Sequence, residues 1–224
     1  MRYPILFVAA LAAFLGFASV SSGAGWALTA DTPLSYTFDQ PHLNKQSPTS
    51  GGFAAYDHRS TGDVSGSKVM LISPFHVGVG YEDYSVRQTT TVGSNTPGQG
   101  CPAGVSCAGS FRMNVRMVDV AVDIPMRFVN LSVGYGQGEA DVDIVLPAIV
   151  GAMFAPIRHA AVTQTFVTLG IPLGARLDVH LGYHWVQVAE KDLVNANSGG
   201  GGGGAPDKLQ ASGQMLSAGL RMNF

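Results

Sequence analysis

The residues of this chain that could do chemistry are charged and histidine side chains standing at alternate positions of apolar stretches. They are His76, Glu82, Arg112, Arg116, Asp119, Asp123, Arg176, Asp178, His180, His184 and Arg221. Acids and bases on one face of neighbouring strands form ion pairs, and histidines among them can also bind metal. His180 and His184 are too far apart on an extended chain to share one zinc ion without further ligands. We therefore expect an ion-pair network with no metal or cofactor.

The elements that must position these residues are β-strands with a period of two. In RLDVHLGYHW (176–185), every second residue from Leu177 to Trp185 is apolar, and the residues between are polar or glycine. PFHVGVGYE (74–82) and NLSVGYGQG (130–138) alternate in the same way. This pattern indicates strands with one face in an apolar environment and the other in a polar one.

The composition narrows the class of protein. Only 12% of the 224 residues are charged, whereas soluble domains average about 25%. The net charge of −2 includes no basic excess of the kind that a nucleic-acid partner requires. Beyond the N-terminal segment there is no run of about 18 uncharged apolar residues, so the sequence predicts no transmembrane helix.

The chain ends in LSAGLRMNF, where apolar residues alternate up to a terminal aromatic: Leu216, Leu220, Met222 and Phe224. Tight turns near residues 125–126 and 172–174 alternate with long loops near 89–110, 140–161 and 190–211. This layout resembles that of small bacterial outer-membrane β-barrels of the OmpA/OmpX kind. The resemblance implies a location in the outer membrane, with lipid around the barrel. It also implies that the barrel-assembly machinery reads the terminal strand as its assembly signal.

The expected fold is therefore all-β, a transmembrane antiparallel up-and-down β-barrel of eight strands over residues 25–224. Six strands follow from the alternation, the first of them running from Val69 to Gln88. Bacterial single-chain barrels have even strand numbers from about eight upward, so two more strands are expected before Lys68. LSYTFD (34–39) and GFAAYDH (52–58) are the candidates. With Phe224 at the periplasmic end, the long loops face outward.

The stretch FRMNVRMVDVAVDI (111–124) changes phase partway along. Its apolar residues are odd-numbered up to Met117 and even-numbered from Val118. A β-bulge near Met117–Val118 would keep one apolar face throughout. Alternatively, the strand projects beyond the membrane, where its two faces need not keep the same partners.

The inside of an eight-stranded barrel is barely wide enough for side chains, so the charged residues are expected to pair and fill it. Inward glycines such as Gly78, Gly134 and Gly182 would leave room for a thread of water. The favoured function is a structural or surface-exposed, non-catalytic role. A narrow pore for small solutes and a lipid-modifying enzyme are the alternatives. Barrels of that enzymatic kind use a histidine and a serine, and His58-Arg59-Ser60 has a comparable spacing.

The N-terminus has the features of a secretory signal peptide covering residues 1–24. Arg2 precedes an apolar run at 5–17, and small residues follow, with cleavage expected after Ala24 or Ala27. A membrane anchor is the alternative, although the apolar core is short for a span. Another apolar segment, LPAIVGAMFAPI (146–157), lies in a long loop, where we expect a short helix or a strand extension that packs on its own barrel. Contact with lipid, a plug in the mouth of the barrel and contact with a partner are the alternatives.

Export predicts a disulfide between Cys101 and Cys107, which bracket the loop CPAGVSC. Mass spectrometry without reductant should find both thiols protected from alkylation. Barrel stability should change little in a Cys101→Ser variant, because the pair lies in a loop outside the closed sheet. Two alkylatable thiols in the exported protein would rule the disulfide out.

Overall fold

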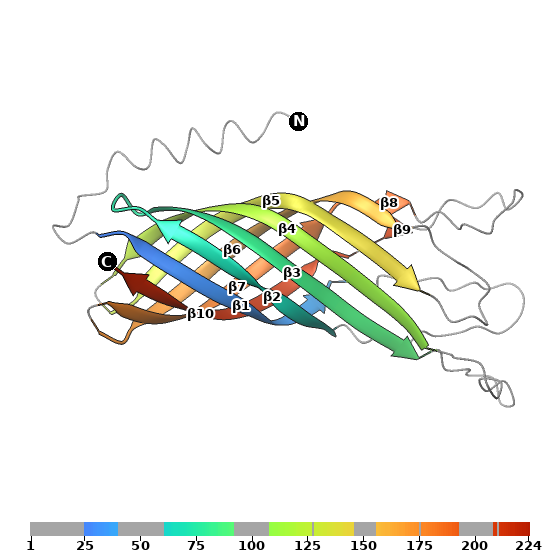
Figure 1. The fold of residues 1–224 in the computed structure, drawn as a ribbon, viewed down its shortest axis with the longest axis horizontal. Helices are drawn as coiled ribbons and strands as arrows, with labels where there is room; N and C mark the ends of the chain where they lie inside the picture. Colours follow the sequence, from blue (N-terminus) through green and yellow to red (C-terminus); the bar gives the residue numbers. More distant parts are fainter. Residues whose placement is uncertain are drawn as a thin grey trace, which may run out of the picture.

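The computed structural model describes residues 25–39, 61–91, 108–126, 128–145, 156–174, 176–192, 208–209 and 211–224. Eight strands form one closed antiparallel barrel (Figure 1). They are β1 (Ala27–Phe38), β2 (Thr61–Ile72), β3 (Val77–Thr91), β4 (Ala108–Pro125), β5 (Asn130–Val145), β6 (Ile157–Pro172), β7 (Leu177–Val188) and β10 (Gly213–Asn223). β8 (Lys191–Asp192) and β9 (Lys208–Leu209) pair separately. Within these ranges, no helix has the length and apolar character needed to cross a membrane.

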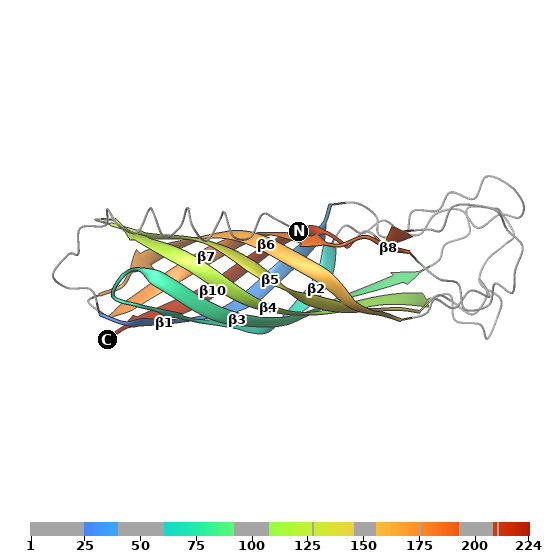
Figure 2. The same cartoon turned by 90° about the horizontal axis from the view of Figure 1, so that it is seen from above.

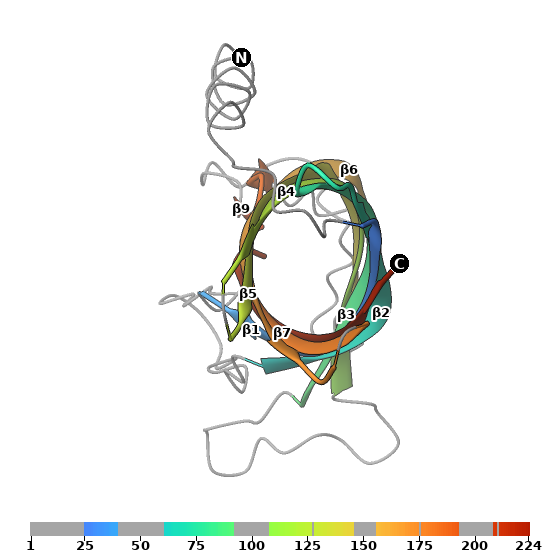
Figure 3. The ribbon, with the colours of Figure 1, turned by 90° about the vertical axis from the view of Figure 1, so that its left-hand side faces the viewer.

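The barrel closes between its first and last strands. β10 pairs with β1 from Ala27↔Asn223 to Phe38↔Gly213, and every other strand pairs with its neighbours in chain order. Beyond the last ladder position, the Phe224 amide donates to the Trp26 carbonyl at 2.8 Å. Viewed along the long axis, the strands form a ring (Figure 3). The expected eight-stranded up-and-down barrel is confirmed.

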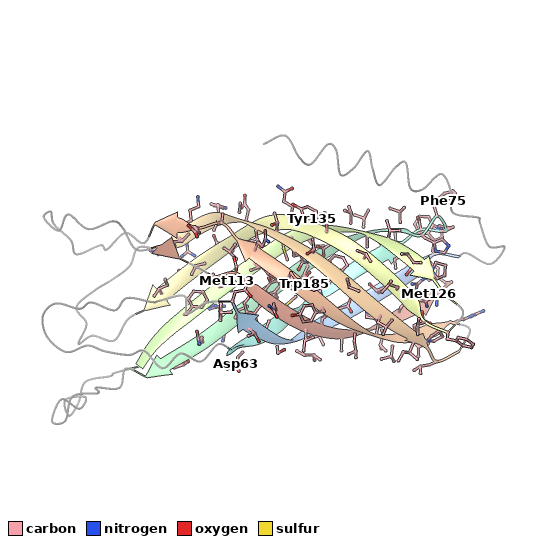
Figure 4. All side chains as sticks on the ribbon, turned by 180° about the vertical axis from the view of Figure 1, so that it is seen from behind. Asp63, Phe75, Met113, Met126, Tyr135 and Trp185 are labelled. Atoms are coloured by element: carbon pink, nitrogen blue, oxygen red, sulfur yellow. The ribbon has the colours of Figure 1, made fainter. Side chains whose placement is uncertain are left out.

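The two ends of the barrel differ in their connections. Short turns at 73–76, 126–129 and 173–176 join β2 to β3, β4 to β5 and β6 to β7. Phe75 and Met126 mark this end in Figure 4, and the C-terminus lies there too, at the left of Figure 1. β8 and β9 lie at the opposite end, and the strands run obliquely between the two ends (Figure 2). We call these the turn end and the loop end.

The expectation of one strand from Val69 to Gln88 was wrong, because a turn divides this stretch. The Ser73 amide donates to the Val77 carbonyl at 2.8 Å, and the His76 amide donates to the Ser73 carbonyl at 2.9 Å. Pro74 has no amide hydrogen for a ladder, and His76 adopts a left-handed backbone conformation with φ of 62°. These local features divide a stretch that the sequence analysis treats as one strand.

The two strands before this turn also differ from the expectation. The candidate at 34–39 is the second half of a longer β1, and a register shift between Pro33 and Ser35 leaves Leu34 exposed while Tyr36 is buried. β2 begins at Thr61, whereas the candidate at 52–58 lies outside the described residues. Three further expectations concern residues outside the described ranges: the signal peptide at 1–24, the cysteine pair and most of the apolar loop at 146–157. Ile157, the last residue of that loop, begins β6.

The phase change in β4 is not a bulge. β4 pairs with β3 and with β5 in unbroken register along its whole length. Its odd-numbered residues point inward throughout: apolar from Phe111 to Met117, and including the acids Asp119 and Asp123 further on. Its described even-numbered side chains point outward, and they are polar up to Arg116 and apolar from Val118. The structure therefore agrees with the second interpretation, a strand that continues beyond the apolar part of the wall.

The apolar part of the outer wall forms a band next to the turn end. On β7 the outward residues run from Leu177 to Trp185, a height of about 20 Å at the usual strand rise and tilt. On three strands the outward apolar run ends in an aromatic residue, Tyr81, Tyr135 or Trp185, and the next outward residue is polar. Trp26, Phe75, Phe128 and Phe224 are exposed at the turn end. Aromatic residues at both margins of an apolar band are typical of a membrane-spanning barrel.

The band predicts where an added charge is costly. Leu181, in mid-band, is 61% exposed, so Leu181→Arg should lower the free energy of unfolding from lipid vesicles by about 2–4 kcal/mol. Gln187→Arg, on the same strand face but above the band, is the matched control and should have little effect. Equal losses in urea titrations of the two variants would contradict the assignment of the band.

Candidate functional site

The lumen is the candidate site, and it is filled in two layers. The layer toward the loop end is apolar and contains Tyr36, Phe38, Tyr84, Phe111, Met113 and Met117 among its buried side chains. The rings of Phe38 and Phe111 meet edge to face with their centroids 5.4 Å apart. The Tyr36 hydroxyl donates to the Ala211 carbonyl at 2.8 Å. This layer closes the barrel above the apolar band.

The second layer is polar and lies at the level of the band, with Lys68 near its centre. The Lys68 Nζ is 3.1 Å from Asp119 Oδ2 and 3.7 Å from Glu82 Oε2. It also lies 3.2 Å from the centroid of the Phe166 ring. All four side chains are buried. Two carboxylates share one cation here, and the Phe166 ring adds cation–π stabilisation.

Gln164 connects this group to the far wall of the lumen. Its Nε2 donates to Glu82 at 2.5 Å and to Asp119 at 2.9 Å, which turns its Oε1 toward His184 Nδ1 at 3.2 Å. Because the amide oxygen only accepts, His184 must donate from Nδ1. His184 Nε2 lies 3.0 Å from the Ser217 hydroxyl, and its ring stacks on Phe166. The network therefore spans the lumen from β3 to β10.

A second polar group lies nearer the turn end. The Arg221 Nη1 is 2.8 Å from Asp123, and its Nε is 3.7 Å from Asp178. Ser132 and Asn130 donate to the same two carboxylates at 2.8 and 2.7 Å. His76 Nδ1 lies 3.6 Å from Asp123. These contacts pair both buried carboxylates with the Arg221 guanidinium, as burial of charge requires.

Between the two polar groups, His180 contacts Asp31 through its Nε2. Next to this pair is a cavity of about 20 Å³ that Lys68, Asp31, His180 and Arg221 help to line. A cavity needs about 10–15 Å³ to hold one water molecule. This cavity therefore has room for about one water molecule.

Inward glycines make room for the large side chains of the network. A Cβ at Gly136 would lie 2.0 Å from Asp119 Oδ1, and one at Gly134 would lie 2.1 Å from the Phe166 ring. Side chains from neighbouring strands therefore occupy the space in front of these glycines. The thread of water expected beside such glycines has no room at these two positions.

The structure places most of the expected lumenal residues in the two polar groups. They are His76, Glu82, Asp119, Asp123, Asp178, His180, His184 and Arg221. The expectation was wrong for three arginines. Arg112 and Arg116 point outward from the polar part of β4, where the phase change reverses the faces, and Arg176 is exposed in the turn at 173–176.

Other lumenal residues escaped the sequence analysis. Lys68 stands at the head of the apolar run KVMLI, which shows no alternation although Lys68 and Met70 are buried and Val69 is exposed. Gln164 lies in VTQTFVTLGI, where polar and apolar residues share both faces. Asp31, Asn130, Ser132 and Ser217 were also missed. Lys68 lies an even number of residues before Ile72, the last residue of β2, and therefore on the same inward face. The sequence analysis did not predict the turn at 73–76, so it did not identify this face.

Four of the remaining candidates lie on the outer surface, in β10 or directly after it. Leu216, Leu220, Met222 and Phe224 face outward and are each about half exposed or more. Their role as an assembly signal stays a prediction. His58-Arg59-Ser60, the pattern considered for catalysis, lies outside the described residues.

Closure, the apolar outer band and the filled lumen define a class: the chain has the fold of a small bacterial outer-membrane β-barrel. No protein-family model and no curated protein matches the sequence. Among solved structures, the chain is similar to Neisserial surface protein A, with 10% identity, coverage of 90% of this chain and 98% of that one, and a TM-score of 0.50.

Two further structures are similar at lower scores. For OprG of Pseudomonas aeruginosa, the identity is 8%, the coverage 90% of this chain and 97% of that one, and the TM-score 0.49. For Ail of Yersinia pestis, the identity is 12%, the coverage 88% of this chain and 98% of that one, and the TM-score 0.43. At such identities the likeness concerns the fold.

The network predicts a large difference between two cationic residues. Lys68→Met leaves Glu82 and Asp119 uncompensated in the lumen and should lower the free energy of unfolding by about 3–5 kcal/mol. Arg116→Gln is the control, because Arg116 is 69% exposed and 3.8 Å from Asp83, and such pairs contribute about 0–1 kcal/mol. Urea unfolding in lipid vesicles measures both, and similar losses would contradict this account of the lumen.

Proposed function

We propose that the protein is a sealed outer-membrane barrel with a structural or surface-exposed role, and that it neither conducts solutes nor catalyses a reaction. The observation that carries this proposal is the double filling of the lumen. A polar network crosses the lumen at the level of the apolar band, and an apolar layer closes it toward the loop end. A solute would have to displace both layers to pass.

The polar layer is a barrier because its buried charges form ion pairs with one another. An ion entering the lumen would have to separate Lys68 from its two carboxylates or Arg221 from Asp123 and Asp178. Separating a buried pair costs about 3–5 kcal/mol when one partner is left alone. Small fluctuations of single side chains therefore open no path through this layer.

The part of the barrel beyond the band supports a surface role. β3, β4, β5 and β6 have 15–18 residues each, against 11–12 in the other four barrel strands. Apart from Ala161, their described outward side chains beyond the band are polar, and one ion pair there joins Arg158 to Asp143 at 2.8 Å. In the orientation usual for such barrels, with short turns in the periplasm, this wall faces outward from the cell.

The same proposal includes two partners. Outer-membrane lipid surrounds the apolar band, and the barrel-assembly machinery acts on the C-terminal strand. The outward residues of β10 and the terminal Phe224 support the second, because they are accessible along one face of the closing strand.

Planar-bilayer recordings test the seal. The purified protein should give no stable single-channel currents across a range of voltages, whereas a general porin inserted by the same procedure should conduct. Stable currents of porin size from the wild-type protein would overturn the sealed barrel and favour the narrow pore. Folded protein is verified beforehand by its heat-modifiable migration on gels.

A further inference from the structure

A groove lies on the outer wall, separate from the lumen, where the apolar band meets the polar extension. Its volume is about 230 Å³. Residues from four adjacent strands line it, among them Tyr81, Asn114, Arg116, Gln137, Glu139 and His159. Its lining shares Met117 with the apolar layer of the lumen, and none of its lining residues belongs to the ion-pair network.

A bulge between β5 and β6 builds the upper rim. The register shifts between Ala140 and Val142, and His159 on the facing strand has a left-handed φ of 54°. This conformation directs the His159 amide to Asp141 Oδ1 at 3.1 Å and the ring Nδ1 to Glu139 Oε2 at 2.6 Å. Bulges of this kind re-aim a side chain that regular pairing would direct elsewhere.

The lower rim belongs to the apolar band. Tyr81 and Val118 are 50% and 56% exposed. Val118 is paired in register with Tyr81 on β3 and with Gln137 on β5. The groove therefore opens downward onto the lipid-facing surface and upward onto the polar wall. This shape fits an amphiphile whose chains lie along the band and whose headgroup occupies the groove.

The charges of the lining describe the headgroup. Arg116 and His159 face Glu139 and Asp141, so both signs are present in about equal number. The hydrogen bond that His159 donates to Glu139, together with the negative charge of Glu139, raises the pKa of His159, which lies beyond the band. The balance favours neither a simple anion nor a simple cation. Amides from Asn114 and Gln137 and the exposed face of Tyr81 complete a set of groups that suits a sugar ring with its hydroxyls.

We propose that this groove binds the sugar headgroup of a glycolipid in the outer leaflet, with the acyl chains lying along Val118 and the apolar band. The volume agrees, since pockets for whole drug-sized ligands measure about 300–1,000 Å³ and only a headgroup needs to enter here. The proposal rests on the orientation given under the proposed function, with the loop end outward, but not on the seal of the lumen.

Competition between two lipids tests the groove. The purified barrel is incubated with equal amounts of lipopolysaccharide lacking O-antigen and of phosphatidylglycerol, and native mass spectrometry counts the bound molecules. The test variant is Tyr81→Ala with Gln137→Ala. The matched control is Trp185→Ala with Gln187→Ala, an aromatic and a glutamine on the outer face of β7. Heat-modifiable migration verifies that each variant is folded.

The wild-type protein and the control should retain lipopolysaccharide in preference to phosphatidylglycerol, and the test variant should bind lipopolysaccharide about tenfold more weakly, a change of about one decade in Kd. Equal weakening in both variants would assign the binding to the aromatic margin in general and overturn the groove. No preference for lipopolysaccharide in the wild-type protein would overturn the headgroup class. A conducting barrel that still binds lipopolysaccharide through Tyr81 and Gln137 would overturn the seal alone.

Discussion

Backbone hydrogen bonding inside lipid is the constraint on which the rest of this structure depends. A strand in hydrocarbon has no water for its amides and carbonyls, so the sheet must close on itself. Closure by β10 on β1 gives each barrel strand two neighbours. The number of strands then sets the width of the lumen, and eight strands leave space for side chains alone. The crowded lumen is thus a consequence of closure as much as of the residues that occupy it.

The outer face of the barrel wall contacts lipid at the level of the band and water beyond it. At the level of the band, the outer face is apolar and the inner face holds Lys68, Glu82 and Asp119. Beyond the band, the outer face carries Arg116 and Glu139, and the inner face resembles the core of a soluble β-protein. The inversion follows from the medium outside, because the apolar side chains of each strand face lipid where there is lipid and face one another where there is water.

The sequence predicted the architecture better than the site. Alternation along β3, β5 and β7 identified strands and faces because each has lipid on one side and polar or small residues on the other. It failed at Lys68, whose neighbours Val69, Met70, Leu71 and Ile72 are apolar on both faces. It also failed at Arg112 and Arg116, since parity alone does not reveal the height at which a strand leaves the band. The groove depends on a register shift after Ala140, which no local sequence pattern predicts.

The unbroken ladder of β4 has a consequence for how such a barrel adapts to its membrane. β4 keeps one register with both neighbours through the level at which its outward residues change from polar to apolar, so the backbone geometry is the same inside and outside the hydrocarbon layer. Only the outward side chains, such as Arg116 and Val118, define where that layer ends. Exchanging residues at one or two outward positions per strand would therefore change the hydrophobic thickness of the barrel by a few ångström. Matching to a thicker or thinner bilayer can thus evolve without altering the fold.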